Sequence, residues 1–280
     1  MPADGLALDA FPGRVVLELD DVKTRQQAVW TSGDYAAVAA RIVIIAEELC
    51  EAADLRAGAR VLDVAAGSGN ATLAAARRGC EVVGVDYVPE LLERGRLRAD
   101  AEGLEVEFAT GDAEALPFED GSFDAVISVL GVMFAPNQEQ AAAELLRVCR
   151  PGGRIALASW TPDSFIAEMF RTVTAHAPQP PGLKPPALWG TEERLEELLG
   201  AGLETLETRK RQFAFRYRSP DEFARFFARN YGPVTTAAAR MDDGGETLVA
   251  ELADLAARHN REEGSLVVLS SYLEALAIRK

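Results

Sequence analysis

Two carboxylates and two glycines stand at a spacing that suits a ligand containing a nucleoside. The stretch from 61 to 70 is VLDVAAGSGN, which places Asp63 ahead of Gly67 and Gly69, and Asp86 ends the next apolar run. Glycines at a strand-to-helix turn allow a ligand to approach the backbone closely. An acid at the end of the second strand can accept hydrogen bonds from both hydroxyls of a ribose.

Asp63, rather than the glycines, indicates which kind of nucleoside ligand this is. The turn nearly matches G-x-G-x-x-G, with Thr72 in the place of the last glycine, so by itself it is compatible with a dinucleotide or with a purely steric role. A carboxylate directly before the turn repels a pyrophosphate and suits a ligand with an ammonium or sulfonium cation. This disfavours an NAD-dependent Rossmann oxidoreductase, which is kept as the alternative interpretation because the glycine pattern is compatible with it.

A further acid stands in the segment 111–129, GDAEALPFEDGSFDAVISV. Asp112 directly follows the third apolar run, where its side chain can accept a hydrogen bond from an exocyclic amine. The segment then leads through two aromatic residues into a fourth apolar run, and RPGGRI at 150–155 leads into a fifth.

These residues stand at the ends of alternating strands and helices. Strands are predicted over 60–65, 81–86, 105–110, 124–129, 154–159, 203–217 and 272–279, and helices over 34–53, 71–78, 89–101, 138–148, 192–199, 219–231 and about 236–260. The alternation predicts an α/β fold, a Rossmann-like doubly wound, mostly parallel seven-stranded sheet with a helical insertion or lid. Because the carboxyl ends of parallel strands share one edge of the sheet, the candidate residues are expected to meet there.

Composition and charge exclude several classes of partner. The chain of 280 residues has 29 basic and 44 acidic side chains, a formal charge of −15, which argues against nucleic acid and against anionic membranes. Its three cysteines, Cys50, Cys80 and Cys149, are widely separated, so neither a metal site nor a disulfide framework is expected. The first residues do not resemble a signal peptide and no apolar run is long enough to span a membrane, so a cytoplasmic protein is expected.

Taken together and in this order, the motifs resemble the class I S-adenosylmethionine-dependent methyltransferases. D-x-A-x-G-x-G, an acid ending the second strand, G-D-A-x-x-L-P-F, F-D-A-V and R-P-G-G-R-I carry the resemblance over about residues 30–160. The branch it resembles contains ubiquinone- and menaquinone-biosynthesis and natural-product enzymes, which act on small molecules. Two positions depart from the family pattern: Ala65 replaces a usual glycine, and Asn70 follows Gly69. The extra methyl group of Ala65 is expected to be tolerated if the backbone torsion at this position is ordinary.

The resemblance implies S-adenosylmethionine as the cofactor and S-adenosylhomocysteine as its product. It implies that the turn lies against the methionine portion with Asp63 near the amino group, that Asp86 holds the ribose, and that Asp112 with the Ala113 amide contacts the adenine edge. Trp30 and Tyr35 are candidate lid residues, with simple packing as an equal alternative. The full set of implied cofactor-binding residues is Asp63, Ala65, Ala66, Gly67, Gly69, Asp86, Tyr87, Leu91, Asp112, Ala113, Val129, Trp30 and Tyr35.

The resemblance also divides the chain into four segments. Residues 1–55 are expected to form an N-terminal helical cap and residues 56–217 the S-adenosylmethionine-binding core. Residues 218–266 are expected to be a helical insertion over the substrate site, and residues 267–280 the last strand of the core sheet.

The acceptor is expected to be a small, largely hydrophobic molecule, methylated at O, N or C by in-line displacement. Met133 and Phe134 follow the fourth strand, and His176 opens a proline-rich loop that can lie over the acceptor, although a solvated loop histidine is the simpler interpretation. Further apolar candidates are Phe165, Phe170, Trp189, Phe226 and Phe227, for which core packing is the competing explanation. The sequence names no catalytic base, and a non-catalytic cofactor-binding protein stays a further alternative.

Overall fold

A seven-stranded sheet forms the centre of the molecule. The computed structural model describes residues 19–280, so the first 18 residues of the predicted cap, including the segment that does not resemble a signal peptide, lie outside the described residues. The strand order is β3-β2-β1-β4-β5-β7-β6, with β7 antiparallel to both of its neighbours. The strands are β1 (Arg60–Val64), β2 (Glu81–Asp86), β3 (Glu107–Thr110), β4 (Phe123–Val129), β5 (Cys149–Trp160), β6 (Leu203–Tyr217) and β7 (Leu266–Arg279). The predicted Rossmann-like, mostly parallel sheet is confirmed.

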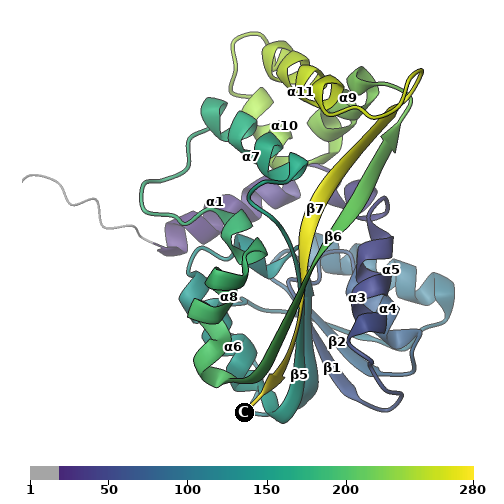
Figure 1. Cartoon of the computed structure of the whole chain (residues 1–280), viewed down its shortest axis with the longest axis vertical. Helices are drawn as coiled ribbons and strands as arrows, with labels where there is room; N and C mark the ends of the chain where they lie inside the picture. The colour runs from purple at the N-terminus through teal and green to yellow at the C-terminus, as the bar shows by residue number, and fades with distance from the viewer. Residues whose placement is uncertain (1–18) are drawn as a thin grey trace, which may run out of the picture.

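Helices cover both faces of this sheet (Figure 1). One face carries α3 (Val43–Ala52), α4 (Asn70–Ala76) and α5 (Pro89–Glu102), and the other carries α6 (Gln138–Val148) and α8 (Glu192–Leu199). Covering on both faces explains why β1 and β2 are buried along almost their whole length and why their sequences are nearly continuous apolar runs.

A second group of helices lies beyond the carboxyl edge of the parallel strands. It contains α1 (Leu19–Thr31), α7 (Phe165–His176), α9 (Pro220–Asn230), α10 (Gly232–Ala238) and α11 (Glu246–Arg258), seen toward the top of Figure 1. Helices α9 to α11 stand between β6 and β7 in the chain, which is the order expected for the insertion at 218–266. None of the helices within residues 19–280 is long and apolar enough to cross a membrane.

Several predicted elements differ in extent from the structure. The helix predicted over 34–53 is two helices, α2 (Tyr35–Ala39) and α3, because the chain turns between residues 40 and 42 and buries Ile42. The helix predicted near 236–260 is likewise divided into α10 and α11, since Gly244 and Gly245 between them have positive φ angles. Helices α1 and α7 were not predicted, and β5 and β7 are longer than predicted. Short 3-10 turns at Val132–Phe134, Pro186–Gly190 and Gly200–Gly202 complete the chain.

The amino-terminal helix is held by close backbone contact with the insertion. A side chain at Gly33 would lie 2.4 Å from the Asn230 carbonyl oxygen, and one at Gly232 would lie 2.0 Å from that of Val29. Ser32 and Thr236 share a hydrogen bond of 2.9 Å at the same place. Segments about 200 residues apart in the chain therefore meet without space for side chains between them.

Candidate functional site

A cavity lies at the carboxyl ends of β1, β2 and β4, under α1. It contains about 1000 Å³ of space, part of it open to solvent. Most of the predicted site residues line it: Trp30, Tyr35, Asp63, Ala65, Ala66, Gly67, Asp86, Tyr87, Leu91, Asp112, Ala113, Val129 and Phe134. Gly69, Met133 and His176 are not part of the lining.

Asp63 is a buried carboxylate at the floor of the cavity. It is 1% exposed, and its Oδ2 accepts hydrogen bonds from the Thr72 backbone N–H at 2.8 Å and from the Thr72 hydroxyl at 2.7 Å. Burial raises the pKa of Asp63 to about 7, against the lowering effect of the two Thr72 hydrogen bonds. Within the described part of the chain, its Oδ1 accepts no hydrogen bond, so this oxygen is the one that can receive a cationic group of a ligand.

Asp86 holds the glycine turn from the cavity side. Its Oδ2 accepts the Gly67 N–H at 2.8 Å and its Oδ1 accepts the Val88 N–H at 2.9 Å. Burial raises the pKa of Asp86 to about 6, although the backbone hydrogen bonds oppose this shift. Because a carboxylate has about four acceptor positions, both oxygens can still accept a hydroxyl donor from a ligand.

Asp112 is engaged by a lysine that the sequence did not single out. Lys23 of α1 donates to Asp112 at 2.7 Å and pairs with the buried Glu114 at 2.6 Å. Burial alone would lower the pKa of Lys23, but the hydrogen bonds to the two carboxylates outweigh it and raise that pKa. Lys23 therefore ties α1 across the end of the cavity at which Asp112 lies.

The glycine turn has a left-handed backbone at three positions. The φ angles are 56° at Ala65, 55° at Gly67 and 83° at Gly69. The torsion at Ala65 is therefore not ordinary, and the condition for tolerating its methyl group without cost is not met: this alanine occupies a conformation that costs an L-residue roughly 1–2 kcal/mol. A side chain at Gly131 would lie 2.4 Å from the Ala65 carbonyl oxygen, so a glycine is required there. Gly69 packs outside the cavity, against Phe108.

Helix α1 closes the cavity mainly through polar contacts. Gln27 donates to the Tyr87 carbonyl oxygen at 2.5 Å and Gln26 donates to that of Phe134 at 3.3 Å. The ring of Trp30 makes edge contacts with those of Phe134, at a centroid distance of 5.0 Å, and Tyr35, at 5.5 Å.

An aromatic wall stands at the β4 end of the cavity. It consists of Trp30, Phe134, Phe170 and Tyr231, and each ring contacts the next at centroid distances between 5.0 and 6.4 Å. Trp30 and Phe134 face the cavity, and Phe170 and Tyr231 lie behind them. Of the other apolar candidates, Phe165, Trp189 and Phe227 are buried in the core, and Phe226 lies under the guanidinium of Arg41.

Two predicted substrate residues lie elsewhere. Met133 is 1% exposed and packs in the main hydrophobic core, because the 3-10 turn after β4 directs it inward. His176 is the last residue of α7, and its Nε2 lies 2.7 Å from a carboxylate oxygen of Glu251 on α11. Neither side chain reaches the cavity in this structure.

The residues present fit a nucleoside joined to an amino acid with a positive charge. Asp63 offers an unengaged oxygen in a buried position, where an ammonium would restore favourable pairing of its charge. The turn leaves its glycine backbone bare: a side chain at Gly67 would meet only the Tyr35 ring, at 3.6 Å. The carboxylates at the ends of β1 and β2 leave no place for a pyrophosphate against this turn.

Comparison with known proteins gives the class. A family model described as a methyltransferase domain matches residues 62–157, which include the glycine turn, Asp86, Asp112 and β4. A structure of the YcgJ protein from Bacillus subtilis superposes with a TM-score of 0.61 at 22% identity, over 84% of this chain and 97% of that one, and shows the same fold. The chain belongs to the class I S-adenosylmethionine-dependent methyltransferases, and its cofactor is S-adenosylmethionine.

Two relatives are more similar in sequence. The uncharacterized protein Rv1405c of Mycobacterium tuberculosis is 43% identical over 229 residues, which are 81% of this chain and 83% of that protein. The demethylmenaquinone methyltransferase of Thermus thermophilus is 45% identical over 109 residues, 38% of this chain and 50% of that enzyme.

Proposed function

We propose that this methyltransferase acts on a small, largely hydrophobic acceptor with an aromatic ring, such as a phenol or a quinol. The observation that carries the proposal is the aromatic wall at the β4 end of the cavity. Aromatic side chains in edge contact bind a planar apolar molecule well and offer little to an anionic one. The name of the Thermus thermophilus relative, a demethylmenaquinone methyltransferase, supports the same class.

The cofactor-side roles are proposals that follow from position. Asp63 would pair with the amino group of the methionine portion, Asp86 would accept the ribose hydroxyls, and Asp112 would contact the adenine amine. Helix α1 would cover the cofactor through Lys23 and Trp30 and so exclude water from the reaction.

Positioning and exclusion of water would supply most of the catalysis. S-adenosylmethionine brings a methyl group that is already activated for displacement, so an aligned acceptor needs little further help. Burial raises the pKa of Tyr35 to about 12 and that of Tyr231 well above its ordinary value. Both phenols therefore stay neutral near pH 7 and cannot act as a general base, and Tyr35, which lines the cavity, can donate a hydrogen bond to an acceptor oxygen.

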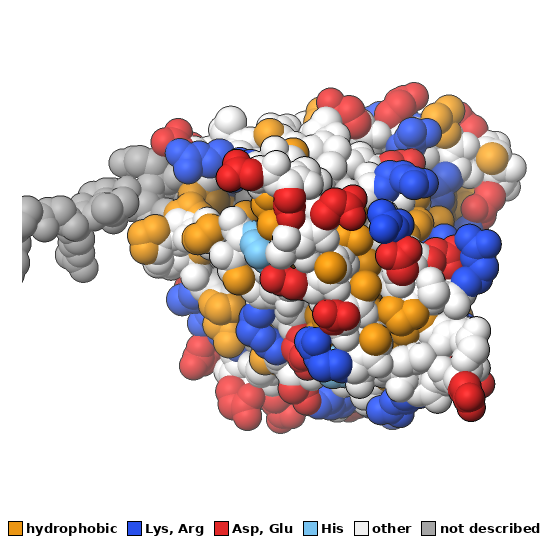
Figure 2. Space-filling view, turned by 90° about the horizontal axis from the view of Figure 1, so that it is seen from above, with side chains coloured by type: hydrophobic (Ala, Val, Ile, Leu, Met, Phe, Trp, Pro, Cys, Tyr) orange, Lys and Arg blue, Asp and Glu red, His pale blue; other side chains and the backbone are white. Residues whose placement is uncertain are grey.

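The surface supports a small acceptor over an extended phosphate backbone. On the face seen in Figure 2, Lys and Arg side chains are interspersed with Asp and Glu, rather than gathered in one basic stripe. Binding of nucleic acid depends on clustered basic residues, and the formal charge of −15 opposes it further.

The test is S-adenosylhomocysteine release with a panel of phenols, quinols and polyketides, beside tRNA and a basic peptide. We expect turnover with members of the first group alone. Phe170→Ala should raise the KM of the aromatic acceptor at least threefold and leave the KM of S-adenosylmethionine unchanged, because Phe170 supports the Phe134 ring of the wall from behind and does not line the cavity beside the turn. Phe118→Ala is the matched control, since Phe118 is a half-buried phenylalanine that packs on Phe123. Turnover with tRNA or the peptide alone would refute the proposal, and binding without release of product with any acceptor would favour a non-catalytic role.

A further inference from the structure

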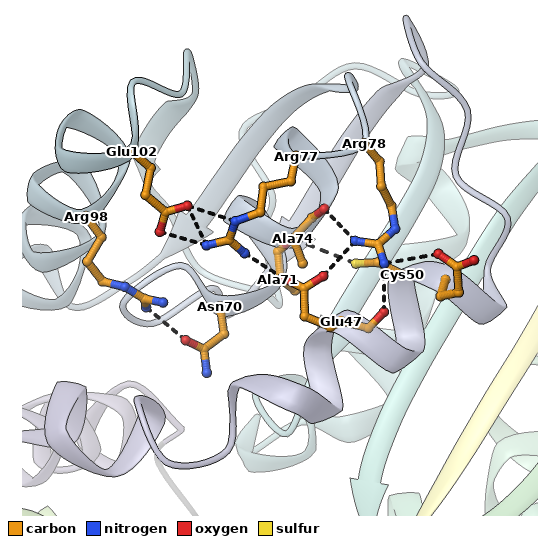
Figure 3. A network of polar contacts seen from close by, with 10 residues as sticks. Glu47, Cys50, Asn70, Ala71, Ala74, Arg77, Arg78, Arg98 and Glu102 are labelled. Carbon is orange, nitrogen blue, oxygen red and sulfur yellow. Dashed lines mark hydrogen bonds and ion pairs between the residues drawn. The ribbon is translucent and has the colours of Figure 1, made fainter.

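Asn70, where the chain departs from the family pattern, joins three segments around the glycine turn. Its side chain is 9% exposed and donates through Nδ2 to the carbonyl oxygen of Ala39, the last residue of α2, at 2.8 Å. Its Oδ1 accepts a hydrogen bond of 2.8 Å from Arg98 on α5 (Figure 3). One side chain therefore links α2, the first residue of α4 and α5.

Arg98 directs its guanidinium at neutral oxygens of the turn. Its Nη1 lies 2.6 Å from the Ser68 carbonyl oxygen and 3.4 Å from the Ser68 hydroxyl, in addition to the contact with Asn70. The nearby Glu102 pairs with Arg77 instead, as Figure 3 shows, and no carboxylate among residues 19–280 pairs with Arg98. Burial lowers the pKa of Arg98. Arg98 is thus a half-buried cation held by neutral oxygens alone among the described residues, whereas buried arginines usually have an acid partner.

These contacts hold the cofactor turn at Ser68, next to the residue that Asp86 holds. Ser68 stands between Gly67 and Gly69, which have positive φ angles and, as glycines without a Cβ atom, leave the backbone of the turn free to adopt other conformations. Asp86 accepts the Gly67 N–H at 2.8 Å, and Arg98 donates to the Ser68 carbonyl oxygen at 2.6 Å. Through Ala39, the same network anchors the helix whose first residue, Tyr35, lies over Gly67.

We propose that Asn70 and Arg98 form a clamp that positions the cofactor turn and the Tyr35 ring for S-adenosylmethionine binding. Arg98 is a positioning residue, since it acts on the cofactor only through Ser68 and Asn70. The clamp concerns the cofactor side of the site and does not depend on which acceptor is methylated, so measurements with the cofactor product alone can test it.

The first test measures S-adenosylhomocysteine affinity by calorimetry for Arg98→Met, which keeps the aliphatic stem and removes the donors. We expect the Kd to rise about tenfold, which corresponds to about 1.4 kcal/mol. Arg98→Lys, which keeps a charge and can replace one hydrogen bond, should give an intermediate Kd. The exposed Arg94, one turn away on α5, provides the control, and Arg94→Met should leave the Kd unchanged. A Kd within twofold of the parent value for both Arg98 variants would overturn the proposal.

The second test separates positioning from general stability. With any acceptor that turns over, Arg98→Met should raise the KM of S-adenosylmethionine and leave kcat at saturating cofactor nearly unchanged, whereas a purely structural defect would lower the active fraction and so kcat. Asn70→Ala should also weaken S-adenosylhomocysteine binding. The double variant should weaken it by less than the product of the two single effects, because the two side chains share a contact. Single effects that multiply fully would mean that the residues act independently, contrary to the clamp.

Discussion

Replacing Asp63 with asparagine should make the ligand-free protein more stable at neutral pH while weakening cofactor binding. The pKa of Asp63 is raised from 3.8 to about 7 in the folded chain. Between these values the native carboxyl keeps its proton and the unfolded one loses it, so the stability contribution is present in acid and is lost as pH rises toward 7. The slope is about 1.4 kcal/mol per pH unit and falls off as the native carboxyl ionises near pH 7, so the loss between pH 5 and pH 7 is about 2 kcal/mol.

The Asp63→Asn variant avoids this loss because its amide does not ionise. Its oxygen can still accept the hydrogen bonds from Thr72, which hold the side chain in place. Relative to the parent, the variant should therefore gain about 3 kcal/mol between pH 5 and pH 8, or roughly 5–10 °C in melting temperature. The amide NH2 of the variant would face the cavity as a donor, where the ammonium of the ligand needs an acceptor. The Kd for S-adenosylhomocysteine should therefore rise at least tenfold.

Thermal unfolding at pH 5 and pH 8, with and without S-adenosylhomocysteine, checks the prediction. Asp124→Asn is the control: the hydrogen bond from Arg150 and the one from the Arg60 N–H hold the pKa of Asp124 below its usual range, so it is ionised at both values of pH. That variant should be less stable than the parent by the same amount at both. Parallel pH profiles for the parent and Asp63→Asn would refute the reasoning, because they would mean that Asp63 titrates in the same way in the folded and unfolded chain.

Three other substitutions test the remaining contacts of the cavity. Ala65→Gly should raise the free energy of unfolding by up to about 1 kcal/mol, because relief of the left-handed torsion exceeds the extra entropy of an unfolded glycine; a lower denaturation midpoint would contradict this. Lys23→Met should weaken S-adenosylhomocysteine binding roughly three- to tenfold and reduce its salt dependence, measured by calorimetry at two ionic strengths. Asp86→Ala should weaken the same binding by tenfold or more, since it removes the proposed acceptor of the ribose hydroxyls and the partner of Gly67; an unchanged Kd would place the ribose elsewhere.

The sheet and the helix starts follow from local patterns and were predictable. The strands β2 and β6 and the helix α6 match their predicted bounds, because apolar runs and turn residues define them without reference to the rest of the chain. The helix starts at Ser219 and Thr191 are also as expected, and each of these side chains accepts a backbone N–H three residues later.

Helix α1 could not be predicted in the same way, because little of it is apolar. Its sequence, LDDVKTRQQAVWT, buries a single residue, Val22, and it binds the core mainly through Lys23, Gln26 and Gln27. Contacts between a polar side chain and a backbone oxygen far away in the sequence have no periodic pattern.

The role of Arg98 could not be predicted for the same reason, because its partners, Ser68 and Asn70, lie about 30 residues earlier in the chain. The carboxylates of the site were predictable because strand ends fix their place. The torsion of Ala65 was not, since only the tertiary turn sets it.

The glycine contact between the amino-terminal helix and the insertion has a kinetic consequence. Gly33 and Gly232 place α1 and the α9–α10 junction backbone against backbone, so α1 cannot rise from the cavity without displacing the junction that carries Tyr231 of the aromatic wall. The cofactor and the acceptor then both depend on the same movement of α1 and the α9–α10 junction to enter the cavity. We expect an ordered sequence of binding, in which S-adenosylmethionine enters first and the helices close before the acceptor is held, and in which S-adenosylhomocysteine leaves last.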